Sequence, residues 1–304
     1  MKLFKYTLAV AAACMVMVSC VKYDDISRTG HPNYGTVYLN TSWPGSYNSP
    51  ATGFTAYANY PDDYSKAITN LHSYEGALPD LFVPGRGVRI AIYNVVQAGE
   101  SLSNSFKVLN GKSLEAKVNY DPNNPPDLNE DGNPIEPYFI NPNPSLLFFG
   151  ISNPFEVVAD DTVRVSVATK QLVRKVSVVI DNASITPPAG ATGVSGVSGV
   201  FHNIGTEIDM ASGKVFNPQW LNIPSFASKS VDDGHGGTKI LWTADIAILG
   251  TVAGADPELV LKFSLIGSDA DVFYSVPGMV QAFAGFNDDK REPFEYLISD
   301  VDLN

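Results

Sequence analysis

The chain is poor in the residues that build most catalytic, metal and disulfide sites. Two cysteines and four histidines occur among its 304 residues, namely Cys14, Cys20, His31, His72, His202 and His235. The histidines are scattered, so no group of them has the spacing of metal ligands. The composition therefore predicts a protein that is not an enzyme and that carries no cofactor and no metal ion.

Two glycine-rich runs need a separate interpretation, because glycines also occur in catalytic loops. The run at 193–199 sets serines among glycines but nowhere forms the G-x-S-x-G pattern of a nucleophile elbow. The run at 235–237, His-Gly-Gly, resembles the oxyanion loop of lipases, yet no elbow accompanies it. We expect turns at 193–199 and a hairpin turn at 235–237.

Basic residues are also scarce. The chain has 20 lysines and arginines against 32 aspartates and glutamates, a formal net charge of −12. If residues 1–19 are removed, Lys2 and Lys5 leave with them, and 18 basic against 32 acidic residues give −14. Such a surface repels nucleic acid and anionic lipid headgroups. We therefore expect no nucleic-acid partner.

Long hydrophobic runs are absent, and the apolar segment at 8–18 is too short to span a bilayer. It follows Lys2 and Lys5 and ends at Ser19-Cys20, so residues 1–19 are predicted to be a lipoprotein signal peptide. The ending resembles the lipobox of bacterial lipoproteins, in which Cys20 becomes the acylated first residue. An ordinary signal peptide with a chance cysteine is the alternative. With Cys14 discarded, the mature chain would have no partner for a disulfide.

Acyl chains on Cys20 would hold the protein on a membrane, because each buried methylene contributes about 0.8 kcal/mol. The segment 20–33 would then be a tether. Asp24 and Asp25 within it resemble the acidic residues that direct some Bacteroidota lipoproteins to the outer face of the outer membrane. We therefore expect a lipid-anchored outer-membrane protein that is exposed at the cell surface, with retention in the periplasm as the alternative.

The rest of the chain has the pattern of β-strands. Apolar residues alternate with polar ones at 37–41, 163–167, 176–180, 242–248 and 259–265, with turn clusters between them. This predicts an all-β protein of two antiparallel β-sandwich domains in series, an N-terminal domain at 34–167 and a C-terminal domain at 168–304. The proline-rich stretch 119–144 is expected to be a surface loop of the first domain. A short helix is expected at Tyr64–Tyr74, with Ala67, Ile68 and Leu71 on one side.

Three segments together resemble a known family. Residues 163–181, VRVSVATKQLVRKVSVVID, are similar to the interdomain junction of the Bacteroidota fimbrillin-like superfamily. Residues 143–150 resemble the strand that precedes this junction, and residues 194–205 resemble the turn and strand that follow it. The resemblance implies two transthyretin-like β-sandwich domains and a fimbrial anchor or accessory subunit that takes part in fimbria assembly and adhesion. Its implied partners are other fimbrial subunits, with a host or bacterial surface molecule as a further ligand.

In this family, subunits join by β-strand addition, and shaft subunits lose an N-terminal strand at a basic site. Arg28, Arg86 and Arg89 are basic residues of the N-terminal part, but none stands in an alignable motif. This favours a permanently lipidated anchor or accessory subunit over a shaft subunit. The C-terminal segment 294–303 is expected to be the last strand of its own domain, with donation to a neighbouring subunit as the alternative.

Two other functions remain open from the residues alone. Tyr57, Tyr60 and Tyr64 could stack on a sugar, as in a surface glycan-binding lipoprotein of a polysaccharide-uptake system. The segment Asp127–Gly132 matches the opening of a calcium loop, but Tyr138 stands where an EF-hand has glutamate. We interpret that segment as a solvated acidic loop, with calcium binding as the alternative.

Overall fold

The computed structural model describes residues 34–44, 54–61, 68–73, 76–77, 82–94, 106–108, 115–141, 144, 146–284 and 293–304. Nearly all regular structure in these residues is β-strand. Helix is confined to a 3-10 turn, η4 (Asn182–Ser184), and a single α turn, α2 (Met279–Ala282). No described helix has the length and apolar character needed to cross a membrane. The predicted all-β fold class is confirmed.

The N-terminal body consists of two sheets that enclose a small core. A three-stranded sheet has the order β11-β1-β4, and a six-stranded sheet has the order β12-β9-β5-β2-β3 with β10 paired to β5. The bounds are β1 (Thr36–Ser42), β2 (Phe54–Asn59), β3 (Ile68–Ser73), β4 (Gly76–Ala77), β5 (Gly85–Asn94), β9 (Phe148–Ile151), β10 (Phe155–Val157), β11 (Thr162–Ala168) and β12 (Lys170–Gln171). Alternate residues of β1, β5 and β11 fill the space between these sheets.

The C-terminal body is larger. A four-stranded sheet has the order β17-β18-β13-β21, a seven-stranded sheet has the order β20-β19-β15-β16-β8 with β7 on β15 and β6 on β7, and β14 pairs with β22. The bounds are β6 (Phe106–Val108), β7 (Glu115–Val118), β8 (Phe139–Ile140), β13 (Arg174–Asp181), β14 (Ile185–Thr186), β15 (Gly193–Asp209), β16 (Val215–Ile223), β17 (Ala227–Asp232), β18 (Thr238–Ile248), β19 (Glu258–Ile266), β20 (Val272–Ser275), β21 (Phe294–Ile298) and β22 (Val301–Asp302).

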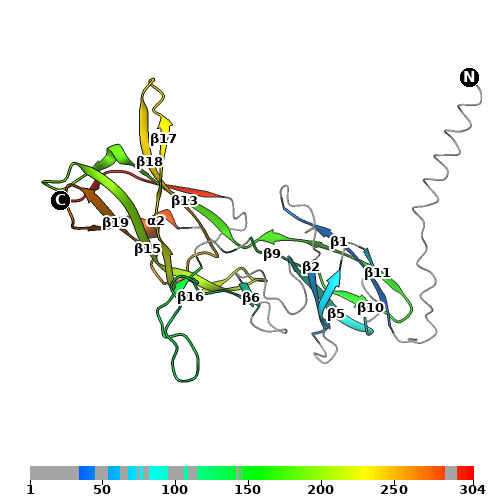
Figure 1. The fold of residues 1–304 in the computed structure, drawn as a ribbon. Coiled ribbons are helices and arrows are strands. Elements are labelled where there is room, and N and C mark those ends of the chain that lie inside the picture. Colours follow the sequence, from blue (N-terminus) through cyan, green and yellow to red (C-terminus); the bar gives the residue numbers. More distant parts are fainter. Residues whose placement is uncertain are drawn as a thin grey trace, which may run out of the picture.

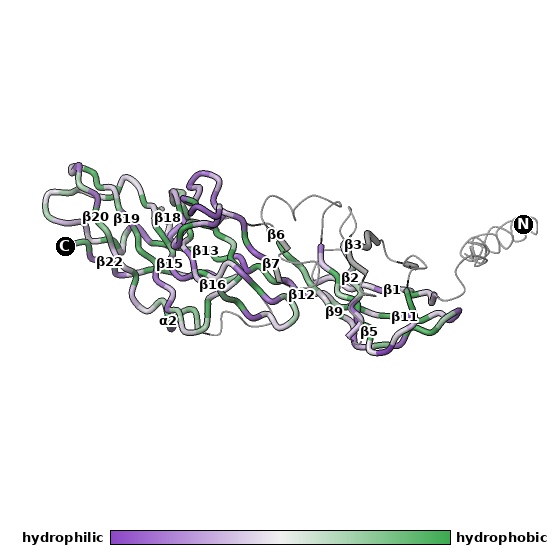
Figure 2. The backbone as a smooth tube through the Cα atoms, turned by 90° about the horizontal axis from the view of Figure 1, so that it is seen from below, coloured by the Kyte–Doolittle hydropathy of each residue, from purple (hydrophilic) through white to green (hydrophobic). Residues whose placement is uncertain are grey.

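The two bodies lie end to end, with β9 reaching from the N-terminal sheets towards the start of β13 (Figure 1). Apolar and polar residues alternate along many strands of both bodies (Figure 2). The larger core cluster includes Tyr57, Ala91 and Phe149 of the six-stranded sheet together with the C-terminal core. Packed apolar side chains therefore connect the bodies, because one face of the N-terminal sheet is buried against its neighbour.

Strand pairing departs from a purely antiparallel arrangement. Among the pairs described, β1 with β11, β8 with β16, β13 with β21 and β14 with β22 are parallel. The remaining pairs are antiparallel. A parallel pair needs a long connection between its strands. Each of these pairs accordingly joins segments that are far apart in the sequence.

The alternating segments form strands as predicted. In β1, Val37 and Leu39 are buried at 0% and 1% exposure, and the strand runs beside β11 in register from Thr36↔Thr162 to Ser42↔Ala168. In β19, the four residues Leu259, Leu261, Phe263 and Leu265 face the core. Burial of every second residue explains why the period of two identifies these strands.

The chain passes from one body to the other near residues 168–174, but other strands cross this point. β12 still pairs with β9, whereas β13 pairs with β18 and β21. Before that point, β7 already pairs with β15, and β8, inside the proline-rich stretch, pairs with β16. We keep the domain boundary between residues 167 and 168 as a proposal. Segment 115–140 precedes this boundary, but its strands pair with strands of the C-terminal body.

The expectation that 119–144 is a surface loop of the first domain is wrong, because β8 within it pairs with β16 of the C-terminal body. Two further local predictions are wrong. Residues 68–73 of the expected helix form β3, which pairs with β2, while 64–67 and 74 lie outside the described residues. The glycine and serine run 193–199 is not a turn but the first part of β15, paired with β19 along this run and with β16 at Gly199. In both places, hydrogen bonding to neighbouring strands overrides the local preference of the sequence.

The glycines of β15 offer a matched test of strand packing. A Cβ added at Gly205 would collide with the Val215 Cγ1 atom and lie 3.2 Å from Val252 Cγ2, whereas one at Gly196 would meet nothing nearer than 3.9 Å. We expect Gly205→Ala to destabilise the protein by about 1–3 kcal/mol through overpacking. Gly196→Ala should be neutral or stabilise by up to about 1 kcal/mol. Urea unfolding followed by circular dichroism measures both, and equal midpoints for the two variants would contradict the packing around β15.

A second prediction concerns β1, whose apolar residues fill the smaller core. Leu39→Ala leaves a cavity among Val37, Ile90 and Val165 and should lower the free energy of unfolding by about 2–5 kcal/mol. Asn40→Ala, an exposed position on the same strand, should change it by less than about 0.5 kcal/mol. Because two bodies can unfold in separate steps, the effect is read from Trp43 fluorescence in a background in which Trp220 and Trp242 are replaced by phenylalanine. Loss of stability in Asn40→Ala but not in Leu39→Ala would refute the assigned orientation of β1.

Candidate functional site

The residues assigned to membrane attachment lie outside the described part of the chain. Cys20, the tether at 20–33, Arg28 and His31 all precede residue 34, where the described structure begins. Acylation of Cys20 therefore stays a prediction. The first described strand, β1, begins two residues after that point.

Two of the three tyrosines considered for sugar stacking are buried. Tyr57 and Tyr60 are 5% and 2% exposed, and Tyr64 lies outside the described residues. Burial raises the pKa of the Tyr60 hydroxyl to about 12. Tyr57 belongs to the core between the two bodies. Sugar stacking on Tyr57 and Tyr60, which the sequence left open as an alternative, is contradicted because both rings are buried.

The acidic loop at 127–132 is ordered by its own asparagine. The Asn129 Oδ1 atom accepts hydrogen bonds from the amides of Asp131 at 3.1 Å and Asn133 at 2.8 Å. Leu128 and Pro134 form an isolated bridge that closes the loop. This is the geometry of an Asx turn, which needs no metal. Among the residues described, no group of three histidine, cysteine or acidic side chains is arranged to hold a metal ion.

The segment around His235 is the turn of the β17–β18 hairpin, as predicted. The Asp233 Oδ1 atom accepts hydrogen bonds from the amides of His235 at 2.8 Å and Gly237 at 2.9 Å. These bonds lower the pKa of the Asp233 carboxyl. Gly234 and Gly236 have φ values of +79° and +83°, a region that favours glycine. The glycines at 234, 236 and 237 therefore form a tight turn and not an oxyanion-binding loop.

The C-terminal segment remains with its own chain. β21 runs parallel to β13, from Val176↔Phe294 to Ile180↔Ile298, and β22 continues beside β14. Val301 and Leu303 are buried in the larger core. This confirms the prediction that the segment is the last strand region of its own domain. As a consequence, β21 becomes the outermost strand of the four-stranded sheet.

The two edges of that sheet differ in chemistry. At one edge, β17 projects with β18 as a hairpin and carries Lys229 and Asp232 on an exposed ribbon (Figure 1). At the other, β21 reads Phe-Glu-Tyr-Leu-Ile, and Leu297 is 60% exposed. Lysine, proline and strong bending are the usual devices that protect a sheet edge. Residues 294–298 of β21 include neither lysine nor proline. Among the described residues, β13 is the only strand that pairs with β21.

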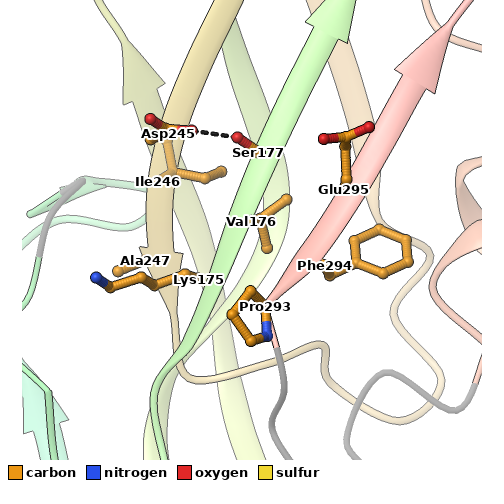
Figure 3. Close-up of a pocket in the computed structure, with 9 residues that line it drawn as sticks. All are labelled: Lys175, Val176, Ser177, Asp245, Ile246, Ala247, Pro293, Phe294 and Glu295. Atoms are coloured by element: carbon orange, nitrogen blue, oxygen red, sulfur yellow. Dashed lines mark hydrogen bonds between the residues drawn. The ribbon is translucent and has the colours of Figure 1, made fainter.

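A pocket of about 510 Å³ lies across the start of this edge (Figure 3). It is lined by Lys175, Val176, Ser177, Asp245, Ile246, Ala247, Pro293, Phe294 and Glu295. The Ser177 hydroxyl hydrogen-bonds to Asp245 on one side, and Glu295 stands on the neighbouring strand. Two carboxylates and one lysine thus surround an apolar floor, which suits a basic or apolar side chain.

Sequence reasoning did not identify these pocket residues. They come from β13, β18 and β21, and only the strand order brings them together. The alternation of each strand indicates which residues face outwards. It does not indicate which strand lies at the edge, because that depends on pairing between segments more than 100 residues apart.

Comparison with known proteins identifies the fold. No protein-family model matches the chain, and no curated protein matches it. A candidate adhesin from Bacteroides ovatus is similar in structure, with a TM-score of 0.52 at 13% identity, over 89% of this chain and 93% of its own. A candidate adhesin from Bacteroides thetaiotaomicron has a TM-score of 0.51 at 12% identity, over 88% and 92%.

The fimbrial anchor protein Mfa2 from Porphyromonas gingivalis also matches, at 12% identity over 86% of this chain and 88% of its own. Its TM-score of 0.39 is too low to equate the two folds. The two Bacteroides structures, by contrast, extend over both bodies of the chain. The chain therefore has the fold of these two Bacteroides proteins.

Proposed function

We propose that the chain is an exported lipoprotein, anchored in the outer membrane through Cys20, that serves as a fimbrial anchor or accessory subunit in adhesion. It carries out no catalysis. The adhesin fold over nearly the whole chain supports the adhesive role. The signal peptide at 1–19 and the acidic tether support export and surface display. Its partners are other fimbrial subunits.

The open edge of β21 is the observation that carries the assembly role. An extended segment of a second subunit can add to this edge, since β21 is the last strand of its sheet among the described residues. Affinity would come from main-chain hydrogen bonds. Specificity would come from a side chain entering the pocket between Asp245 and Glu295, where a basic residue gains a charged partner.

A glycan-binding lipoprotein of a polysaccharide-uptake system is the alternative, and burial of Tyr57 and Tyr60 removes the observation that favoured it. The acidic charge of the chain favours a different subunit, rather than a second copy of this chain, as the partner in strand addition. Two copies with a net charge of −12 repel each other, and a less acidic subunit is repelled less. We therefore retain assembly as the function.

Lipidation is tested by exchanging the two cysteines separately. Cys20→Ala should abolish incorporation of a labelled fatty acid and release the protein from the membrane fraction, because the acyl chains supply the attachment. Cys14→Ala, inside the segment that processing discards, is the matched control and should leave both properties unchanged. Mass spectrometry of the membrane-extracted protein gives the modified residue. A membrane-bound, acylated Cys20→Ala variant would rule out the assigned attachment site.

Strand addition is tested by placing the same charge on either edge of the four-stranded sheet. Leu297→Lys on β21 should reduce cross-linking to neighbouring fimbrial subunits at least tenfold, since lysine disfavours edge pairing. Ser228→Lys on the exposed hairpin strand β17 is the control and should cross-link like the unaltered protein. Cross-linked species are counted on intact cells after confirming equal melting temperatures. If both variants assemble normally, β21 is not the acceptor edge.

A further inference from the structure

One row of side chains crosses five strands of the seven-stranded sheet. Each of five successive strands supplies a single member; these members, which we call the cross-sheet row, are Phe139 of β8, Trp220 of β16, His202 of β15, Glu258 of β19 and Ser275 of β20. Neighbours in the row are in contact across every strand boundary.

The contacts are specific at both ends of the row. The Trp220 ring centroid is 5.5 Å from that of Phe139 and 5.2 Å from that of His202. The His202 Nδ1 atom lies 3.3 Å from a Glu258 carboxylate oxygen, and the Ser275 hydroxyl donates to the other carboxylate oxygen at 2.8 Å. The row is therefore aromatic at one end and a hydrogen-bonded carboxylate at the other.

Strand alternation turns the row away from the core. Phe201, Leu221 and Leu259, each next in sequence to a member of the row, are completely buried. Because successive side chains point to opposite faces of a strand, His202, Trp220 and Glu258 stand on the outer face. Their side chains are accessible there: His202 is 26% exposed and Glu258 is 50% exposed. The hydrophobic core does not account for aromatic rings at these positions.

The carboxylate is held ready to accept hydrogen bonds. The Ser275 hydroxyl and then the His202 ring lower the pKa of the Glu258 carboxyl, so Glu258 is ionised at neutral pH. Lys262, further along β19, is paired with Asp271 at 2.7 Å. No cation is thus paired with Glu258 in the contacts of the row, apart from the histidine when it is protonated.

We propose that the cross-sheet row is a binding site for a neutral carbohydrate chain. The C–H groups of sugar rings pack on aromatic carbon atoms, which Phe139, Trp220 and His202 supply in a strip. Sugar hydroxyls donate to carboxylates, which Glu258 supplies beside the strip. An anionic glycan or a phosphate is disfavoured, since Glu258 and the net charge of −12 would repel it. The inference names an adhesion ligand class beyond the proposed function and does not depend on assembly.

Electrophoresis of the soluble protein through gels that contain a polysaccharide tests this site. The neutral probes are yeast mannan, dextran, laminarin and hydroxyethylcellulose, and the anionic probes are polygalacturonate and chondroitin sulfate. We expect at least one neutral probe to retard the protein and neither anionic probe to do so. Trp220→Ala should raise the dissociation constant for that probe at least tenfold. Absence of retardation by all neutral probes, or retardation only by anionic ones, would overturn the proposal.

Two further variants separate binding from folding. Phe273→Ala removes a ring that is 68% exposed on β20 but outside the row, and it should bind like the unaltered protein. Glu258→Gln keeps the shape of the side chain but removes the charge, so it should weaken binding even if Trp220→Ala fails to fold. Equal losses in Phe273→Ala and Trp220→Ala would show that binding is not located in the row.

The outcome is independent of the assembly experiment. If Leu297→Lys leaves subunit cross-linking intact while Trp220→Ala abolishes polysaccharide binding, the acceptor edge is refuted and the carbohydrate site stands. If neutral polysaccharides do not bind but Leu297→Lys abolishes cross-linking, the reverse holds. Because the two variants lie on different sheets, a defect of one sheet does not imitate the other.

Discussion

The arrangement of the C-terminal body depends on the hydrogen bonding of β13 to the strands on either side of it. β13 is the first strand after the crossover, and it pairs antiparallel with β18 over eight residues and parallel with β21 over five. The first pairing brings Asp245 beside Ser177, and the second makes the C-terminal segment an edge. Pocket, edge and junction all follow from the position of this one strand.

At its start, β13 is also tied to the interior of the body. The Arg174 guanidinium lies 5.4 Å from the centre of the Phe294 ring, and Arg174 is only 9% exposed. Phe294 in turn contacts Phe283, which contacts Phe201 of the opposite sheet. A cation over an aromatic face is favourable when water is excluded. The contact therefore connects the crossover, the edge strand and the core of both sheets.

Much of the fold is predictable from the sequence because one-sided burial leaves a period of two in each strand. That pattern locates β1, β11, β13, β18 and β19, whose inward residues are apolar. It fails where local composition disagrees with pairing: residues 68–73 have a helical pattern but lie beside β2, and the glycines of β15 lie between two strands. Long-range hydrogen bonds decide these segments, and a single sequence does not reveal them.

The candidate sites also differ in whether neighbouring residues or strand pairing determine them. Cys20 is identified by residues next to it in sequence, so the sequence alone suffices to predict it. The cross-sheet row is different, because Phe139, Trp220 and His202 meet only through the order of β8, β16 and β15. Tyr57 and Tyr60 stand close in sequence and look like a platform, yet both are buried. Strand order decides which aromatic residues lie together on a surface. Proximity along the chain does not predict such a surface.

The two proposed interactions use different surfaces of the C-terminal body, so both ligands can bind at the same time. An added strand takes backbone groups at the rim of the four-stranded sheet, while a carbohydrate takes side chains on the outer face of the seven-stranded sheet. The larger core, which includes Val176 and Val178 of one sheet and Leu259 and Leu261 of the other, packs these sheets together. Because such a core is close-packed and stiff, neither site has to deform to admit the other ligand. The C-terminal body can therefore hold a subunit at its edge and leave its outer face open.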